Sequence, residues 1–305
     1  MNQADKHFHM SEAYAENSSS QRTIGQITIG KAVESLAAMA AAGGKNCFYV
    51  LDLACGPGNL TCDLRDAIAA ELPGRQIVVT GLDYSRMNVD KLIENSRGEI
   101  RGLVGSFFEA SSLPDGVDLI FSNEGLHWQP PHEMDEIIYS HLDPGRKEQY
   151  IQWAMQNFKT ALQNIFDSLA DNGVAVLQFG NEGQLSALWR LIRDVLNQTG
   201  FSGYKPSISF PLFYPTLDQM GEAVKDAGFR DADIGIEAFN QDLTENTPEV
   251  ITAFLRAFSE PALRRVMDED VVAAFYSAVS QKLANTDLDA FRKDAWHRTL
   301  VTLKK

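Results

Sequence analysis

The chain has 305 residues, enough to bury a substantial core as one large domain or as one domain with an insertion. It carries 27 Lys and Arg against 41 Asp and Glu, and this net charge of −14 disfavours binding to nucleic acid or to anionic lipid. We therefore expect a small organic molecule as the partner, with no nucleic acid and no membrane. No apolar run approaches the ~20 residues of a membrane span, and the first residues do not resemble a signal peptide. The three cysteines form no paired or metal-like framework, so we predict no metal site and a cytoplasmic location.

Residues 1–22 are polar, and a stretch with helical spacing of apolar residues follows them. The recurring residues are Ile24, Ile27, Ala32, Leu36 and Met39. This spacing predicts an amphipathic helix that begins just after Gln21. The serines before it would cap the helix and hold residues 1–22 as a lid segment over the active site. Whether Tyr14 and Gln21 serve the cap or contact a ligand stays open.

Residues 48–60 read as a buried strand that ends in a glycine turn, followed by a helix over residues 60–71. Asp52 lies at the carboxyl end of the strand, where open α/β sheets bind their ligands. Gly56 and Gly58 have no Cβ, so a ligand can approach the backbone closely.

A second buried strand over residues 76–82 ends at Asp83, a position from which a carboxylate accepts hydrogen bonds from ribose hydroxyls. A dinucleotide fingerprint requires a third small residue where this chain has Thr61. Asp52 would repel phosphate and suits a cation. The turn and its two acids therefore favour S-adenosylmethionine, and a doubly wound domain that binds NAD is the alternative.

A helix over residues 87–95 and a short strand over 101–105 lead to Ser106 and Phe107. The phenyl ring of Phe107 can stack on adenine while the Ser106 hydroxyl meets a ring nitrogen. The alternative is that Phe107 belongs to the core.

The predicted fourth strand, residues 118–122, runs into a loop that contains His127 and Trp128. This loop opens at the same edge of the sheet as Gly56, because the carboxyl ends of parallel strands meet there. The indole N–H of Trp128 is a donor that requires an acceptor. The structural alternative is a Trp packed beneath the sheet and a His at the surface.

The rest of the chain alternates between helical and extended patterns. We predict helices over residues 149–168, 186–197, 217–227, 250–259, 261–267 and 270–283. We predict extended segments over residues 174–179, 207–214, 232–239 and 295–303, the third of them at the sheet edge. The fold class is thus α/β, a doubly wound Rossmann-like sheet with a helical cap. We assign residues 23–130 and 171–245 to the α/β domain and residues 131–170 and 246–305 to the cap.

Together these segments resemble the SABATH family of small-molecule methyltransferases over residues 14–301. The blocks that carry the resemblance are residues 14–21, 105–107, 122–131, 150–158, 210–215 and 256–261. The resemblance implies a class I methyltransferase fold, S-adenosylmethionine as the cofactor and a homodimer as the assembly. It also places the protein in secondary metabolism. The turn Ala-Cys-Gly-Pro-Gly departs from the plant form of the family, and the chain is shorter than plant members.

The resemblance also implies roles for individual residues. It assigns cofactor binding to Tyr14, Ser19, Ser20, Asp52, Gly56, Asn59, Asp83, Tyr84, Ser106, Phe107 and Asn123. It assigns contacts with the substrate to Gln21, His127, Trp128 and Phe213. Gln21 and Trp128 would hold the substrate carboxylate.

Methylation of a carboxylate needs position rather than a base, because the acid is already ionised at neutral pH. Gln21 and Trp128 are uncharged donors that leave the charge on the attacking oxygen, and neither of their blocks, residues 14–21 and 122–131, contains Lys or Arg. We predict a methyl ester of an aromatic or apolar acid and S-adenosylhomocysteine as the products. The alternatives are N- or phenolic O-methylation of a heteroaromatic compound with His127 taking a proton, intramolecular cyclisation, and a non-enzymatic sensor of S-adenosylmethionine.

Overall fold

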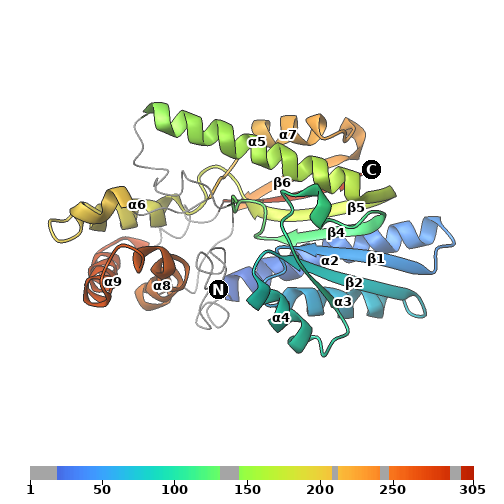
Figure 1. Cartoon of the computed structure of the whole chain (residues 1–305), viewed down its shortest axis with the longest axis horizontal. Helices are drawn as coiled ribbons and strands as arrows, with labels where there is room; N and C mark the ends of the chain where they lie inside the picture. Colours follow the sequence, from blue (N-terminus) through green and yellow to red (C-terminus); the bar gives the residue numbers. More distant parts are fainter. Residues whose placement is uncertain (1–18, 131–143, 208–211, 241–246, 289–296) are drawn as a thin grey trace.

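The strands of the computed structural model form a seven-stranded sheet in the order β3-β2-β1-β4-β5-β7-β6, with helices on both faces (Figure 1). The structure describes residues 19–130, 144–207, 212–240, 247–288 and 297–305. The predicted lid, including Tyr14, lies almost entirely outside these residues. The doubly wound α/β fold predicted from the sequence is confirmed.

The first five strands are parallel. They are β1 (Cys47–Leu53), β2 (Gln76–Asp83), β3 (Arg101–Val104), β4 (Val117–Asn123) and β5 (Leu169–Gly180). β2 and β3 lie on one side of β1, whereas β4 and β5 lie on the other. The chain therefore changes direction between β1 and β4, and ligands of open α/β sheets bind outside the carboxyl ends of strands at such a switch point.

The last two strands close the other end of the sheet. β6 (Ile234–Asn240) is the edge strand, as predicted, and β7 (His297–Lys304) lies antiparallel between β5 and β6. Because β7 is covered on both sides, most of its residues are buried. The chain end that the sequence assigned to the cap is thus an inner strand of the sheet.

Helices cover the two faces of the sheet (Figure 1). One face packs against α2 (Ser19–Ala42), α3 (Asn59–Glu71) and α4 (Arg86–Asn95). The other packs against α5 (Pro144–Ser168) and α7 (Leu217–Asp226). The prediction that α5 belongs to the cap is wrong, since its residues Phe158 and Ile165 lie in the core of the sheet. Among the described helices, none combines the length and the apolar character that a membrane crossing requires.

A separate group of helices lies beside the sheet and has its own core. It consists of α6 (Ser186–Leu196), α8 (Pro248–Leu263) and α9 (Glu269–Ala284). We call this group the cap. The sequence analysis placed α6 in the α/β domain, but Leu188 and Leu191 of α6 pack with Phe275 of α9. An apolar face predicts that a helix packs against another element, but it does not identify that element.

Two further boundaries differ from the prediction. Residues 208–211 of the strand predicted over 207–214 lie outside the described residues; of the remainder, Ser207 ends a 3₁₀ helix (Ser202–Ser207) and Leu212 makes an isolated β-bridge with Trp128. The helices predicted on either side of residue 260 are one helix, α8, which continues through Pro261.

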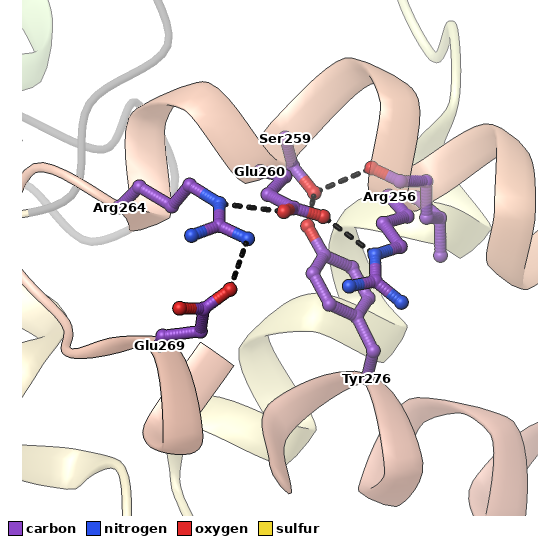
Figure 2. Close-up of polar contacts among 7 residues, drawn as sticks. Arg256, Ser259, Glu260, Arg264, Glu269 and Tyr276 are labelled. Atoms are coloured by element: carbon purple, nitrogen blue, oxygen red, sulfur yellow. Dashed lines mark hydrogen bonds and ion pairs between the residues drawn. The ribbon is translucent and has the colours of Figure 1, made fainter. Parts of the chain in front are cut away.

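A network of charged and hydroxyl groups joins α8 to α9 (Figure 2). The Glu260 carboxylate accepts hydrogen bonds from Arg256 Nε and Arg264 Nε, each at 2.6 Å, and Arg264 also reaches Glu269 at 3.4 Å. Burial alone would raise the pKa of Glu260, but the two guanidinium groups outweigh it and lower the pKa. The family-like block at residues 256–261 therefore holds the cap together in this structure.

The second link in this network is a hydroxyl pair. Ser259 Oγ donates to the carbonyl of Leu255 at 2.6 Å and lies 2.8 Å from the Tyr276 hydroxyl, so Tyr276 donates to Ser259. Burial raises the pKa of Tyr276 beyond the range in which it ionises. Tyr276 is therefore a neutral donor that fixes α9 against α8.

We predict that Glu260→Gln lowers the free energy of unfolding at pH 7 by about 1–2 kcal/mol, because its bonds to two guanidinium groups lose their ionic character. The difference from wild type is present at neutral pH, begins to decline below pH 4.5, the ordinary pKa of Glu, and is lost as the pH falls through the lower pKa that Glu260 has in the folded protein. Urea denaturation across this pH range measures it. Glu269→Gln is the control, because its side chain is 80% exposed. Equal losses in both variants would contradict the role given to Glu260.

Candidate active site

The glycine turn connects β1 to α3 at the switch point of the sheet. Gly56 and Gly58 have φ angles of 54° and 87°, which favour glycine. A Cβ on Gly58 would lie 2.2 Å from the Leu92 side chain, so packing against α4 excludes a larger residue there. A Cβ on Gly56 would meet nothing within 4 Å among the described residues. Gly56 thus presents bare backbone to open space, and Asn59 begins α3 with an exposed side chain.

Asp52 is buried at the end of β1 beside this turn. Its carboxylate accepts a hydrogen bond of 2.6 Å from Thr61 Oγ1. Burial raises the pKa of Asp52 to about 7, the bond from Thr61 opposes this rise, and the nearby charge of Asp83 adds to it. A positive charge bound here would favour the ionised carboxylate.

Asp83 ends β2 and lies on the other side of the turn. It accepts hydrogen bonds from the backbone N–H groups of Gly56 and Ser85, each at 2.9 Å, and from Asn88 Nδ2 at 3.2 Å. Burial nevertheless raises the pKa of Asp83. A carboxylate has about four acceptor positions, and three of those on Asp83 are occupied. About one therefore remains for a ligand hydroxyl. Tyr84, which the resemblance also assigns to cofactor binding, is the next residue in the chain.

Neither Asp52 nor Asp83 forms an ion pair with any Lys, Arg or His in the described part of the chain. Two buried carboxylates beside an open glycine turn fit a ligand that carries positive charge. They do not fit a pyrophosphate, which is itself an anion. The residues of the turn therefore fit the predicted S-adenosylmethionine.

Ser106 and Phe107 follow β3, and they differ in how exposed they are. The Ser106 hydroxyl is partly exposed and accepts a hydrogen bond from the Phe108 N–H at 3.3 Å. The Phe107 ring packs against Phe108 and into the core, with 7% of the residue exposed. The alternative that Phe107 belongs to the core therefore holds for most of the side chain. Little of the ring remains exposed for contact with adenine.

The loop after β4 packs directly against the glycine turn. A Cβ on Gly125 would lie 2.6 Å from Ser122 Oγ and 2.8 Å from Ala54 Cβ. Asn123 at the end of β4 accepts a hydrogen bond of 3.3 Å from Thr28 Oγ1 of α2. The two loops predicted to share one edge of the sheet are thus in contact, and α2 lies against both β4 and β5.

His127 is buried, contrary to the surface alternative. Its Nδ1 accepts a hydrogen bond of 3.5 Å from the Gly180 N–H. Burial lowers the pKa of His127 to about 4; Glu124 opposes this shift, and Arg298 reinforces it. The ring is therefore neutral at pH 7, and because Nδ1 accepts, its proton is on Nε2. His127 can donate a hydrogen bond without carrying charge.

Trp128 is half-buried and packs against the cap. It bridges to Leu212, while the Phe213 N–H donates to the His127 carbonyl at 2.8 Å. Tyr150 of α5 donates to the Leu212 carbonyl at 2.9 Å. A short antiparallel contact between two distant loops therefore holds the His-Trp pair in place.

Phe213 is a core residue in this structure and not a surface for a substrate. It is 1% exposed and packs edge-on against Phe158 of α5, at a centroid distance of 6.3 Å. The predicted substrate contact is wrong for the Phe213 side chain, since the sequence shows an aromatic residue but not the layer it enters. Tyr214 instead lies beside the site, with its ring 5.5 Å from that of His127.

The serines of the N-terminal block lie inside α2, which begins at Ser19. The prediction that they precede and cap the helix is therefore wrong for Ser19 and Ser20. Gln21 also lies in the first turn of α2. The side chains of these three residues are outside what the structure describes, so their assigned contacts stay predictions.

The sequence analysis missed Glu124 and Arg298, which form a buried ion pair at this site. Burial alone would raise the pKa of Glu124, but Arg298 outweighs it and the pKa is lowered. The available signal was a single Arg in the apolar alternation over residues 295–303. No group of three or more His, Cys, Asp or Glu residues that could bind a metal occurs among the residues that the structure describes.

Comparisons with known proteins agree with this fold. A family model for a methyltransferase domain matches residues 50–145. A loganic acid methyltransferase with S-adenosylhomocysteine has a similar structure, with a TM-score of 0.76 at 14% identity, covering 96% of each chain. The YcgJ protein from Bacillus subtilis gives a TM-score of 0.50 at 11% identity, covering 92% of this chain and 98% of that one. No curated protein matches the sequence at a significant level.

We predict that Gly125→Ala displaces the loop after β4, because its Cβ would also lie 3.3 Å from the Leu53 carbonyl. The expected cost is about 1–3 kcal/mol in the free energy of unfolding, as for other overpacked sites. Gly30→Ala is the control, since nothing lies within 4 Å of its Cβ position in α2. Thermal unfolding compares the two. A Gly125→Ala protein as stable as the control would show that the two loops are not in tight contact.

We also predict that the stability of the ligand-free protein falls as the pH rises from 3.8 to about 7, because the folded state retains the Asp52 proton that the unfolded chain releases. The decline attributable to Asp52 is on the order of 4 kcal/mol. Asp52→Asn removes this decline, whereas Asp66→Asn, at an exposed position of α3, retains it. If the free energy of unfolding changed with pH in the same way in wild type and Asp52→Asn, Asp52 would not be a buried carboxylate without a neutralising cation.

Proposed function

We propose that this S-adenosylmethionine-dependent methyltransferase methylates the carboxylate of a small, apolar or aromatic acid and releases a methyl ester and S-adenosylhomocysteine. The observation that carries the proposal is the pair of uncharged donors, His127 and Trp128, in the loop that packs against the glycine turn, which itself suits a cationic ligand. The narrower SABATH membership is part of the same proposal. A structural neighbour that is named for methylation of an acid, loganic acid, supports it.

The residues of the turn account for cofactor binding. When bound, S-adenosylmethionine supplies a methyl group on a positively charged sulfur that a nucleophile attacks from the opposite side. Gly56 gives the ligand access to the backbone, and Asp52 and Asp83 supply negative charge that has no cation among the described residues. The protein thus contributes electrostatic complementarity at this point.

The loop after β4 that contains His127 and Trp128, which we call the acceptor loop, accounts for positioning. A carboxylic acid with a pKa of about 4 is ionised at neutral pH, so the site needs no proton acceptor. Trp128 offers an indole N–H, and His127 offers an Nε2–H from a neutral ring. Such donors can hold one carboxylate oxygen and direct the other, and alignment of this kind contributes about 7–11 kcal/mol to catalysis.

The surroundings of Trp128 favour an apolar acceptor. Four partly buried aromatic side chains pack against the core of the cap, namely Trp128, Trp189, Tyr214 and Phe254. Aromatic side chains with exposed area bind flat or apolar molecules well. We therefore place the hydrocarbon part of the acid between the acceptor loop and the cap.

The alternative in which His127 accepts a proton from a phenol or a ring nitrogen has less support. A histidine whose pKa is lowered to about 4 binds protons weakly at neutral pH. Its Nδ1 is already engaged with the Gly180 N–H. His127 therefore suits hydrogen-bond donation better than proton transfer.

We predict that Trp128→Phe lowers turnover about 10- to 100-fold with little change in cofactor affinity, because the ring is kept and only the N–H is lost. Release of S-adenosylhomocysteine with a panel of aromatic and aliphatic acids gives the rate, and calorimetry gives cofactor affinity. Trp153→Phe in α5, where the ring packs against Tyr150, is the matched control. Turnover that is independent of Trp128 would remove it from the site. Cofactor binding without turnover on any acid would instead favour the sensor.

The pH profile separates the two enzymatic alternatives. Carboxylate methylation gives a rate that is nearly constant from pH 6 to pH 8, since the acid is already ionised. Methylation of a phenol or a ring nitrogen gives a rate that rises through the ionisation of the substrate. A steep rise near neutral pH with the best acceptor would contradict the proposed reaction.

A further inference from the structure

We infer that Arg298 is a positioning residue for the methyl acceptor: its ion pair with Glu124 holds the turn that carries His127 and Trp128. This inference rests on the proposed function and adds to it a residue from the far end of the chain. Arg298 lies in β7, more than 170 positions after Glu124.

The Arg298 side chain is completely buried and belongs to the largest residue buried to this degree among those that the structure describes. Its backbone is opposite Gly180 in the β5–β7 register, and Asn181 Nδ2 donates to its carbonyl at 3.2 Å. The guanidinium reaches Glu124 across β5, which separates β7 from β4. A buried side chain on a backbone that is fixed inside the sheet is suited to fixing the position of its partner.

Glu124 occupies the point where β4 ends and the acceptor loop begins. Its backbone has a φ of 61°, in the left-handed region, and its N–H donates to the Gln178 carbonyl at 2.8 Å. A residue other than glycine adopts this conformation at a cost in energy, so surrounding contacts must maintain it. The ion pair with Arg298 is one such contact, and it sets the direction in which the chain continues toward His127.

The same pair also controls the charge around His127. Glu124 and Arg298 are the two charged groups that act on the buried ring, one raising and one lowering its pKa. Gly180 links them further, since it is opposite Arg298 in the sheet and donates to His127 Nδ1. Because each charge neutralises the other, the acceptor loop has a basic residue nearby without presenting a net positive charge to the substrate.

The test uses the full-length protein and replaces both charges together. The double variant Glu124→Gln, Arg298→Met removes the ion pair without leaving one buried charge alone, which a single substitution would do. Lys304→Met is the control, an exposed position at the other end of β7. We expect the double variant to bind the cofactor as wild type does in calorimetry. With the best acid, we expect turnover to fall about 10- to 100-fold and KM to rise.

A second variant gives a readout that a purely structural role would not move. In Arg298→Met, Glu124 acts on His127 without opposition, so His127 should titrate at a higher pH than the value of about 4 in the wild type. Histidine NMR titration measures this shift. Arg298→Lys retains the charge without the planar fork, so we expect a smaller loss of turnover than in the double variant.

The outcomes separate this inference from the proposed function. If the wild type methylates an acid and the double variant retains its turnover and KM, the inference is wrong and the function stands. If no acid is methylated but His127 shifts in Arg298→Met, the function is wrong and the link between Arg298 and His127 stands. If the double variant does not fold, the two single variants decide: unchanged turnover and KM in Arg298→Lys together with an unshifted His127 titration in Arg298→Met would overturn the inference.

Discussion

Charge buried at the carboxyl edge of the sheet must be neutralised, and this constraint organises the whole site. Among the described residues, three largely buried carboxylates and one buried guanidinium lie at this edge, and only two of these four groups neutralise each other. Glu124 and Arg298 neutralise each other within the protein. Asp52 and Asp83 have no cation in the described part of the chain, so burial raises the pKa of both. The part of the edge that contains Asp52 and Asp83 suits a cationic ligand. The part that contains Glu124 and Arg298 suits an anionic acceptor, which needs uncharged donors.

The two halves act together because their loops touch. Gly125 leaves no room for a side chain between the acceptor loop and Ala54 at the end of β1. On its other side, the acceptor loop is held by the bridge to Leu212 and by the hydrogen bond from Phe213. Backbone contacts of this kind do not depend on side-chain rotamers. They hold His127 and Trp128 at a set distance from the glycine turn, as alignment of two reactants requires.

Much of this organisation was predictable from local sequence. The glycine turn, the acids after β1 and β2, and the loop after β4 all follow buried apolar strands, and parallel strands bring their carboxyl ends to one edge. Phe213 and Phe107 were not predictable in the same way. Both are aromatic residues in blocks that resemble a binding site, and both enter the core of the sheet. Aromatic side chains serve cores and binding sites equally well, so residue type alone does not separate the two.

The sequence by itself determined the α/β class, the shared edge at which the glycine turn after β1 and the loop after β4 lie, and the residue types that meet there, because strand periodicity and turn chemistry act over short distances. Only the tertiary structure decided that α6 joins the cap, that α5 covers the sheet and that β7 enters the sheet between β5 and β6. It also decided that Arg298 meets Glu124. Each of these depends on which distant surface covers an apolar face or neutralises a buried charge, and local pattern does not carry that information.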